Sequence, residues 1–288
     1  MRLATLRRPD SSGTFAAVID GDSAVELTGF ADVGTFLAAP SGRRDAALEA
    51  AASGGTRHDA GAAAFATLVP NPAKVFCVGL NYRNHIAETG NEVPKFPTVF
   101  TKFAESLTGP NDEIEIPAED HRVDWEGELA IVIGGAGRRI PEADAERHIA
   151  GYAVSNDVSM RGWQGRTPEW TQGKCWEAAS PIGPYLVTPD EFTAGARITT
   201  RVNGEVVQED STSDLVFSPA ALVAYLSTIV TLRPGDLILT GTPAGVALGR
   251  RNAEGRHPWL KPGDVLETEI EGLGAQRNVL VAGPVTGR

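Results

Sequence analysis

Residues Trp125–Ile133 have the sequence WEGELAIVI, and its pattern changes half-way along. Polar and apolar residues alternate at first, so in a strand Glu126 and Glu128 point to one face while Trp125 and Leu129 point to the other. The second half is continuously apolar, which is typical of a strand buried in the interior. The segment therefore predicts a strand that leads two carboxylates toward the core. The alternative is an ordinary polar strand face in water.

Strand patterns dominate the chain on both sides of this segment, and they do not alternate regularly with helices. Asn203-Gly204 and Glu271–Gly274 each predict the turn of a hairpin. Few segments favour helix after residue 70. Pro141–Ile149 is one and Ser218–Val230 is the clearest, because Ser218 with Pro219 is a typical helix start. The sequence predicts a mainly β fold with some α structure (α+β). The other expected strands are Lys74–Val78, Thr98–Phe103, Glu113–Ile116, Gly151–Val158, Pro184–Val187 and Leu237–Thr240.

The first part of the chain has a different texture. Strand patterns over Met1–Arg7 and Thr14–Leu27 are followed by two Ala-rich helical segments, Val33–Ala38 and Arg44–Ala52. Glycine and polar residues then predict a loop over Ser53–Ala62. We expect a small N-terminal α+β domain over residues 1–70 and a second domain over residues 71–288.

Composition excludes several classes of protein. The chain has 288 residues with 26 Lys+Arg against 37 Asp+Glu, a formal net charge of −11. An acidic protein is a poor partner for nucleic acid or for an anionic membrane surface. No apolar run reaches the ~18–20 residues of a membrane span, and the N-terminus has no signal-peptide pattern. Two cysteines cannot build a disulfide framework, so we expect a cytoplasmic protein.

Asp157 adds a third carboxylate to the pair in the quoted segment. It ends the strand pattern Gly151–Val158, at the kind of place where sites are built. Two adjacent buried carboxylates repel each other unless a cation lies between them. Three carboxylates favour a hard cation, Mg²⁺, Mn²⁺ or Ca²⁺, over zinc.

His85 and Glu88 form a second candidate pair in NYRNHIAETG (81–90). Residues three apart share a face of a helical turn, and a carboxylate on one ring nitrogen makes the other nitrogen a better base. The pair follows a buried strand through a glycine. The alternative is a contact on a surface helix. The other four histidines, His58, His121, His148 and His257, have no partner pattern and are expected at the surface.

Other candidates carry weaker signals. Lys174 is either a partly buried cation or a loop lysine, and Arg161 and Gln164 follow Asp157 closely enough to reach the same site. The Gly241-Thr242-Pro243 turn offers N–H and hydroxyl donors for a carboxylate. It is not a phosphate-binding Walker loop. Cys175 has no histidine close in sequence and no feature that lowers its pKa.

Six ordered segments taken together resemble the fumarylacetoacetate hydrolase family. The resemblance covers nearly the whole chain. The segments are VGLNYRNHIAE (78–88), DWEGELAIVIG (124–134), GYAVSNDVSMRGWQ (151–164), QGKCWEAASPIGP (172–184), LRPGDLILTGTPAGV (232–246) and LKPGD (260–264). It implies a roll of mixed β-sheets behind a small N-terminal domain, usually in a homodimer.

The resemblance also implies roles. Glu126, Glu128 and Asp157 match the family's ligands for Mg²⁺ or Mn²⁺, with Ca²⁺ in some members. His85 and Glu88 match its catalytic dyad. Lys174 and Gln164 match polar residues that contact substrate or stabilise developing charge. Arg161 and Thr242, with Gly241, match positions that bind an anionic 2-oxo acid.

These roles imply a metal-dependent hydrolase that cleaves a C–C bond of an acylpyruvate- or fumarylpyruvate-type 1,3-dicarbonyl, with a metal-bound enolate as leaving group. Such activity belongs to the breakdown of aromatic compounds. The alternatives are an isomerase or decarboxylase of the 2-hydroxyhepta-2,4-diene-1,7-dioate or oxaloacetate type, and a non-catalytic oxo-acid-binding protein. The family's usual Ala-Arg-Asp is Met160-Arg161-Gly162 here, so an acidic residue is missing beside the site. The segment Gly165–Thr171 and the loop Ala247–Trp259, which carries three arginines, also depart from the common pattern.

Overall fold

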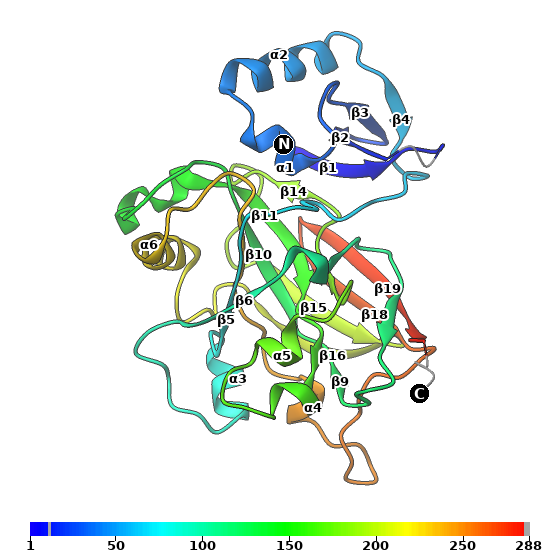
Figure 1. Cartoon of the computed structure of the whole chain (residues 1–288), viewed down its shortest axis with the longest axis vertical. Helices are drawn as coiled ribbons and strands as arrows, with labels where there is room; N and C mark the ends of the chain where they lie inside the picture. The colour runs from blue at the N-terminus through cyan, green and yellow to red at the C-terminus, as the bar shows by residue number, and fades with distance from the viewer. Residues whose placement is uncertain (11–12, 285–288) are drawn as a thin grey trace.

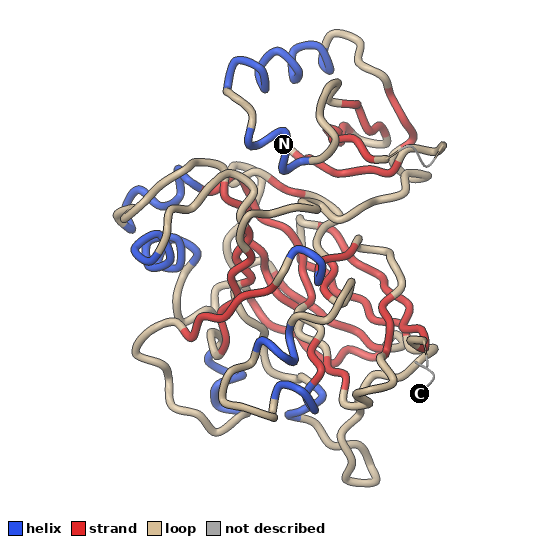
Figure 2. Tube along the Cα trace, viewed as in Figure 1, coloured by secondary structure: helices blue, strands red, loops and turns tan. Residues whose placement is uncertain are grey.

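Strands make up most of the regular structure of this chain (Figure 2). The computed structural model describes residues 1–10 and 13–284. Helices are few and short, so the expected mainly β fold with some α structure is confirmed. The described residues include no helix whose length and hydropathy would let it span a bilayer.

The N-terminal segment folds into a small sheet covered by two helices, at the top of Figure 1. Asp32 begins the first helix with a capping box, accepting the N–H of Thr35 at 2.8 Å. The predicted loop Ser53–Ala62 contains a short strand, because backbone pairing with β3 orders residues whose side chains give no strand signal. The elements are β1 (Arg2–Arg7), β2 (Thr14–Asp20), β3 (Ser23–Glu26), α1 (Val33–Ala38), α2 (Ser41–Ala52) and β4 (Arg57–Asp59).

These strands continue into a ten-stranded sheet of order β4-β3-β2-β1-β14-β11-β10-β17-β5-β6. The junction is the antiparallel pair β1–β14, and the centre is the long antiparallel pair β10–β11. The expected boundary at residue 70 stays a prediction. The further strands of this sheet are β5 (Val75–Gly79), β6 (Thr98–Lys102), β10 (Gly127–Ile133), β11 (Ile149–Asn156), β14 (Leu186–Val187) and β17 (Leu237–Leu239).

A second sheet of five strands has the order β16-β15-β18-β19-β8. Both predicted hairpins lie in it, and Asn203 and Gly204 have the positive φ values, 52° and 82°, that a tight hairpin turn requires. Its strands are β8 (Ile114–Ile116), β15 (Arg197–Val202), β16 (Glu205–Ser211), β18 (Val265–Ile270) and β19 (Gly274–Ala282). Two small pairs, β9 (Val123–Asp124) with β12 (Ser159–Met160) and β7 (Leu107–Thr108) with β13 (Ser180–Pro181), link the rest.

The helices of the larger part are short, apart from α6 (Pro219–Ile229), which begins at Ser218 as predicted. The predicted helix Pro141–Ile149 is a 3₁₀ helix over Glu142–His148, the tighter form that proteins use in short connections. Three short helices, α3 (Arg83–Glu88), α4 (Arg161–Gln164) and α5 (Thr171–Lys174), lie together in the lower half of Figure 1. The remaining 3₁₀ turns are Ala104–Ser106 and Ala247–Gly249.

Candidate functional site

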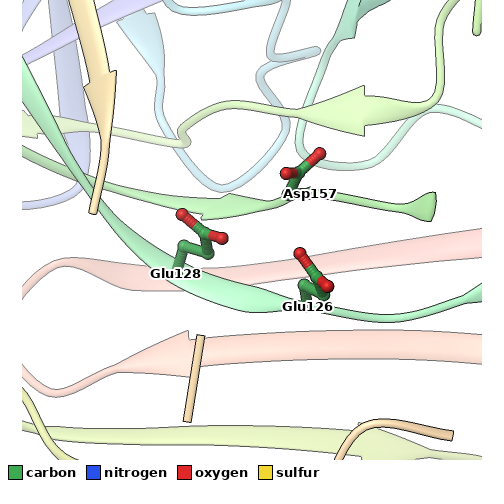
Figure 3. A group of neighbouring side chains, drawn as sticks. All are labelled: Glu126, Glu128 and Asp157. Carbon is green, nitrogen blue, oxygen red and sulfur yellow. The ribbon is translucent and has the colours of Figure 1, made fainter. Parts of the chain in front are cut away.

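The three carboxylates expected to bind metal lie together in the interior. Glu126 and Glu128 rise from one strand and Asp157 from the neighbouring one (Figure 3). One carboxylate oxygen of each lies within 4.8 Å of the others, and the residues are 6%, 2% and 0% exposed. The interior position predicted from WEGELAIVI is therefore confirmed, and the alternative of a solvated polar face is wrong.

Backbone pairing holds these side chains on the same side of the sheet. Gly127 of β10 is paired with Asn156 of β11, and the N–H of Asp157 donates to the carbonyl of Glu126 at 2.8 Å. Glycine at position 127 leaves room for the five-stranded sheet, which comes against this point. A Cβ there would overlap Thr200 of β15. The glycine between the two glutamates thus allows the five-stranded sheet to pack against one face of this segment. The carboxylates of Glu126 and Glu128 lie on the opposite face.

Two buried lysines neutralise two of the carboxylates. Lys174 Nζ lies 2.6 Å from Glu126 Oε2 and 3.0 Å from Asp157 Oδ2. Lys102 Nζ lies 2.5 Å from Asp157 Oδ1 and also donates to the carbonyl of Lys174. Lys102 was not among the predicted site residues. Its signal was present, since Lys102 shares a strand face with Phe100 inside the apolar run Thr98–Phe103.

Arg161 binds the same cluster from α4. Its guanidinium donates to Asp124 Oδ2 at 2.8 Å, to Glu126 Oε1 at 2.6 Å and to Gln164 Oε1 at 2.7 Å. Burial opposes the charged form, yet Asp124 and Glu126 together raise the pKa of Arg161. Asp124 also accepts the backbone N–H groups of Ala247 and Leu248, which ties the loop Ala247–Trp259 to the site.

Glu128 is the carboxylate without a cation. Burial and the neighbouring Asp157 and Glu126 raise the pKa of Glu128 well above its usual value. Its one hydrogen bond among the described residues comes from the N–H of Gly241, at 2.8 Å. Glu126 behaves differently. Burial raises the pKa of Glu126, but Lys174 and Arg161 together lower it by more, and the pKa of Glu126 falls to about 2. No positive charge of the described residues therefore balances Glu128 in this cluster. A hard divalent cation, which prefers oxygen ligands, would supply that charge.

His85 and Glu88 make the contact expected from their spacing. His85 Nδ1 lies 3.1 Å from Glu88 Oε2 on α3, and His85 is 8% exposed. The second oxygen of Glu88 accepts the N–H of Gly245 at 3.0 Å. The carboxylate is therefore held in place, and it holds the imidazole through Nδ1, which leaves Nε2 free of this bond.

The residues of the predicted carboxylate-binding turn use their donors within the protein. The N–H of Gly241 goes to Glu128, as described. The Thr242 hydroxyl donates to the carbonyl of Gly127 at 2.9 Å and accepts from Gln208 Nε2 at 2.8 Å. This turn therefore holds the strand that carries Glu126 and Glu128.

A cavity of about 790 Å³ connects these parts. The carboxylates Glu126 and Glu128, the dyad and the basic residues open onto the same space, so the structure brings together most of the predicted site. Gly241 and Asp157 do not line it. Its lining residues include His85, Glu88, Arg122, Glu126, Glu128, Arg161, Gln164, Trp170, Lys174, Thr242, Leu248, His257 and Trp259.

The acidic residue absent from the Met160-Arg161-Gly162 motif has a spatial replacement. A Cβ at Gly162 would lie 2.6 Å from both carboxylate oxygens of Asp120. Asp120 is 3% exposed, and it accepts the N–H of Trp163 at 3.1 Å and the N–H of Arg122 at 2.9 Å. The glycine therefore leaves room for a carboxylate that belongs to another segment of the chain. The only sign of this in the sequence is the glycine at a position where the family usually has an acidic residue.

Three of the four remaining histidines differ from the expectation. His58 is half-buried with Nε2 3.7 Å from Glu26, and His148 Nδ1 lies 3.1 Å from the carbonyl of Gly135. His257 lines the cavity and stacks on Trp259 at 4.7 Å between ring centroids. Only His121 is exposed as predicted. Their partners come from distant segments, which local pattern does not reveal.

Both cysteines are free thiols, and neither has the properties of a nucleophile. Burial raises the pKa of Cys77 well above its usual value. Burial also raises the pKa of Cys175, whose Sγ lies 3.5 Å from the carbonyl of Thr101. The thiolate form that nucleophilic chemistry needs is therefore disfavoured at both positions.

Comparison with known proteins agrees with this geometry. The chain is 46% identical to the mitochondrial oxaloacetate tautomerase of Xenopus laevis over 217 residues, 74% of this chain and 67% of the relative. It is 46% identical to a human mitochondrial oxaloacetate tautomerase over 221 residues, 75% of this chain and 69% of the relative.

Solved structures show the same similarity across the fold. Maleylpyruvate hydrolase from Sphingobium sp. SYK-6, in complex with manganese(II) and pyruvate, has a TM-score of 0.80 and 29% identity, covering 99% of this chain and 100% of that one. The 2-hydroxyhepta-2,4-diene-1,7-dioate isomerase from Mycobacterium marinum has a TM-score of 0.76 and 31% identity, with the same coverage. Residues 74–281 match the family model described as fumarylacetoacetate (FAA) hydrolase C-terminal. This chain is therefore an enzyme of the fumarylacetoacetate hydrolase family.

Proposed function

We propose that this enzyme uses a divalent metal ion to interconvert the enol and keto forms of a 2-oxo acid of the oxaloacetate class. The observation that carries the proposal is the shared cavity. A histidine with its carboxylate partner, His85–Glu88, opens onto the same space as the carboxylates Glu126 and Glu128. Tautomerisation needs one group that moves a proton and one site that holds the 2-oxo acid, and this cavity contains both. The names of the two tautomerases favour this reaction over the others.

Glu126, Glu128 and Asp157 would hold the metal ion. Three carboxylates suit Mg²⁺ or Mn²⁺, and Ca²⁺ is the less favoured choice. The manganese in the maleylpyruvate hydrolase structure supports this donor set. When bound, the ion supplies Lewis-acid polarisation of the 2-oxo group and lowers the pKa of the adjacent C–H.

His85 would move the proton. Its Nδ1–H donates to Glu88, so the neutral ring presents Nε2 as an acceptor toward the cavity. In the enol-to-keto direction, neutral His85 takes the proton of the enol hydroxyl and, as imidazolium, delivers it to C3. In the reverse direction, His85 takes the proton from C3 and returns it to the 2-oxo oxygen. Glu88, fixed by Gly245, stabilises the imidazolium in between.

The remaining predicted residues would bind or orient the substrate. Lys174 and Gln164 stabilise negative charge that develops on the substrate oxygen. Arg161 orients Gln164 and Glu126 through its hydrogen bonds to both. Thr242 lines the cavity and holds Gly127 between the two glutamates, and Gly241 acts through Glu128.

Hydrolysis of a C–C bond is the second candidate, favoured by the size of the cavity. About 790 Å³ exceeds what a four-carbon acid fills and would admit a longer acylpyruvate or fumarylpyruvate-type substrate. In that reaction His85 would take a proton from water, which attacks the distal ketone. The similarity to maleylpyruvate hydrolase supports this alternative. The similarity to the isomerase from M. marinum supports a third reaction, a 1,3-proton shift in a dioate. Decarboxylation of oxaloacetate would need the same metal site.

A substrate panel with Mg²⁺ or Mn²⁺ separates these reactions. Oxaloacetate freshly dissolved as its enol should lose its ultraviolet enol absorbance faster with enzyme than without, and its mass should stay unchanged. Release of pyruvate from an acylpyruvate would instead identify the hydrolase, and loss of carbon dioxide the decarboxylase. Binding of oxalate without turnover of any compound would identify a non-catalytic oxo-acid-binding protein.

Partner and compartment follow the same proposal. We propose a small anionic 2-oxo acid as the partner, with neither nucleic acid nor membrane, and a homodimer as the assembly. The two free thiols fit a reducing compartment. The cytoplasm meets that condition, and so does the mitochondrial location in the names of the two tautomerases.

A further inference from the structure

Three basic side chains of arginine and lysine line the cavity, and they differ in their partners. Lys174 is neutralised by Glu126 and Asp157, and Arg161 by Asp124 and Glu126. The guanidinium of Arg122 forms no hydrogen bond or ion pair within residues 1–10 and 13–284. Arg122 is therefore the cation in this cavity that is free to meet an anion.

The backbone of Arg122 is nevertheless fixed on both sides. Its N–H donates to the buried carboxylate of Asp120 at 2.9 Å, and its carbonyl accepts the N–H of Arg161 at 2.9 Å. Asp120 in turn occupies the space beside Gly162 and accepts the N–H of Trp163. The backbone of Arg122 is therefore fixed at the cavity, and its exposed guanidinium remains available to a ligand.

Arg122, just before β9, opens onto the same cavity as two of the carboxylates. Arg122, Glu126 and Glu128 all line the cavity, whereas Val123 and Trp125 are buried in the apolar core on the other face. Four residues separate Arg122 from Glu126, so their Cα atoms lie at most roughly 14 Å apart. The cavity wall therefore carries both carboxylates and an unpaired guanidinium.

Two aromatic side chains of the loop Ala247–Trp259 also line the cavity. Val123 forms an antiparallel bridge with Leu260, which places the end of this loop beside the strand that follows Arg122. Trp259 stacks on His257, and both line the cavity. The three arginines of the loop Ala247–Trp259 do not line it. The unpaired positive charge at the cavity therefore comes from Arg122 and not from this loop.

We propose that Arg122 binds the second carboxylate of a 2-oxo dicarboxylic acid whose 2-oxo-acid end lies beside Glu126 and Glu128. Guanidinium and carboxylate form paired hydrogen bonds with defined geometry, so this contact selects dicarboxylates over monocarboxylates. The inference rests on the proposed function, since it places the 2-oxo acid beside these carboxylates. It makes Arg122 the residue that determines specificity, separately from the proton transfer at His85.

The kinetic test uses Arg122→Met and two substrates that differ only in the distal charge, enol oxaloacetate and its 4-methyl ester. A hydrogen bond to a charged group is worth roughly ten- to hundredfold in affinity. We expect kcat/KM for oxaloacetate to fall by that factor in Arg122→Met, while kcat/KM for the ester stays within about twofold, because the ester has no charge to pair. Arg122→Lys should restore part of the loss. Arg256→Met, an exposed arginine in the loop Ala247–Trp259 that does not line the cavity, is the matched control.

A binding experiment keeps this inference separate from the proposed reaction. Calorimetry with Mn²⁺ compares 2-oxoglutarate with 2-oxopentanoate, which has the same chain length without the second carboxylate. The wild-type protein should favour 2-oxoglutarate, and Arg122→Met should abolish that preference without changing Mn²⁺ affinity. An unchanged preference in Arg122→Met overturns the inference. Absence of turnover of oxaloacetate by the wild-type protein overturns the proposed function, and the calorimetry still decides the role of Arg122.

Discussion

Lys102 Nζ lies 2.5 Å from Asp157 Oδ1, and neither side chain is exposed to solvent. Removing one partner of a buried ion pair is strongly destabilising, and without Lys102 the Asp157 carboxylate keeps only Lys174 as a cationic partner in the described part of the chain. We expect Lys102→Met to lower the free energy of unfolding by about 3 kcal/mol in metal-free protein. Saturating Mn²⁺ should restore part of this loss, because the cation replaces the missing charge at Asp157.

Urea denaturation with and without Mn²⁺ measures both effects. Lys261→Met, which removes an exposed lysine, should change neither. Equal destabilisation in the two conditions would show that Lys102 acts through packing alone and not through the charge of the carboxylate cluster.

Glu126 and Glu128 should respond in opposite ways to loss of charge in the metal-free protein. Glu126→Gln removes the partner of Lys174 and Arg161 and should destabilise by about 3 kcal/mol. Glu128→Gln removes a buried carboxylate that has no cation and should stabilise by about 1 kcal/mol or more. Both should lose metal affinity at least tenfold, because each removes a proposed ligand.

Denaturation in a chelating buffer and titration with Mn²⁺ provide the two measurements. A Glu128→Gln protein that is less stable than the wild type would contradict the interpretation of Glu128 as an unpaired buried charge. Full turnover in a chelated sample would contradict the metal-dependent mechanism.

His85 and Glu88 are expected to affect turnover without affecting the metal. His85→Ala removes the proposed proton carrier and should lower kcat by roughly 10²-fold or more. Glu88→Gln keeps the shape but not the charge that stabilises the imidazolium, so its loss should be smaller. His121→Ala, at an exposed histidine, is the control. Unchanged kcat in His85→Ala together with wild-type Mn²⁺ affinity would remove the assignment of His85 as base.

The sequence predicted those parts of the site that depend on local pattern. The alternation of residues in WEGELAIVI predicted that Glu126 and Glu128 share one face of a strand. The three-residue spacing of His85 and Glu88 predicted the contact between their side chains. Hairpins were predictable for the same reason, since Asn203-Gly204 requires positive φ values that few other pairs adopt. Each of these features is determined within about ten neighbouring residues.

The missed features all join distant segments. Lys102 meets Asp157 across 55 residues, and Asp120 meets Trp163 across 43. The strand β4 forms because β3 lies beside it, and His257 reaches the cavity because Asp124 fixes the start of its loop. A single sequence carries no pairing information over such separations, so burial and partners of these residues follow only from the tertiary fold.

Asp112 connects β1, the N-terminal strand, to the larger part of the molecule through hydrogen bonds. It accepts Arg7 Nη2 at 2.7 Å, the Thr108 hydroxyl at 3.0 Å and the N–H of Gly109 at 2.8 Å. Burial favours the neutral acid, but these donors outweigh it and lower the pKa of Asp112 below its usual value. A depressed folded-state pKa stabilises the protein above the unfolded pKa of about 3.9, and this contribution is lost as the pH falls through the folded-state value.

Asp112→Asn should therefore lower the free energy of unfolding at pH 7 by about 1 kcal/mol, a modest value because Arg7 is partly exposed and solvent screens the pair. The difference between variant and wild type should shrink as the pH is lowered from 5 toward 3, since wild-type Asp112 becomes protonated as well. Urea denaturation at several pH values measures this, with Asp45→Asn at an exposed carboxylate as the control. A constant difference across that pH range would mean that Asp112 contributes through its neutral hydrogen bonds and not through its charge.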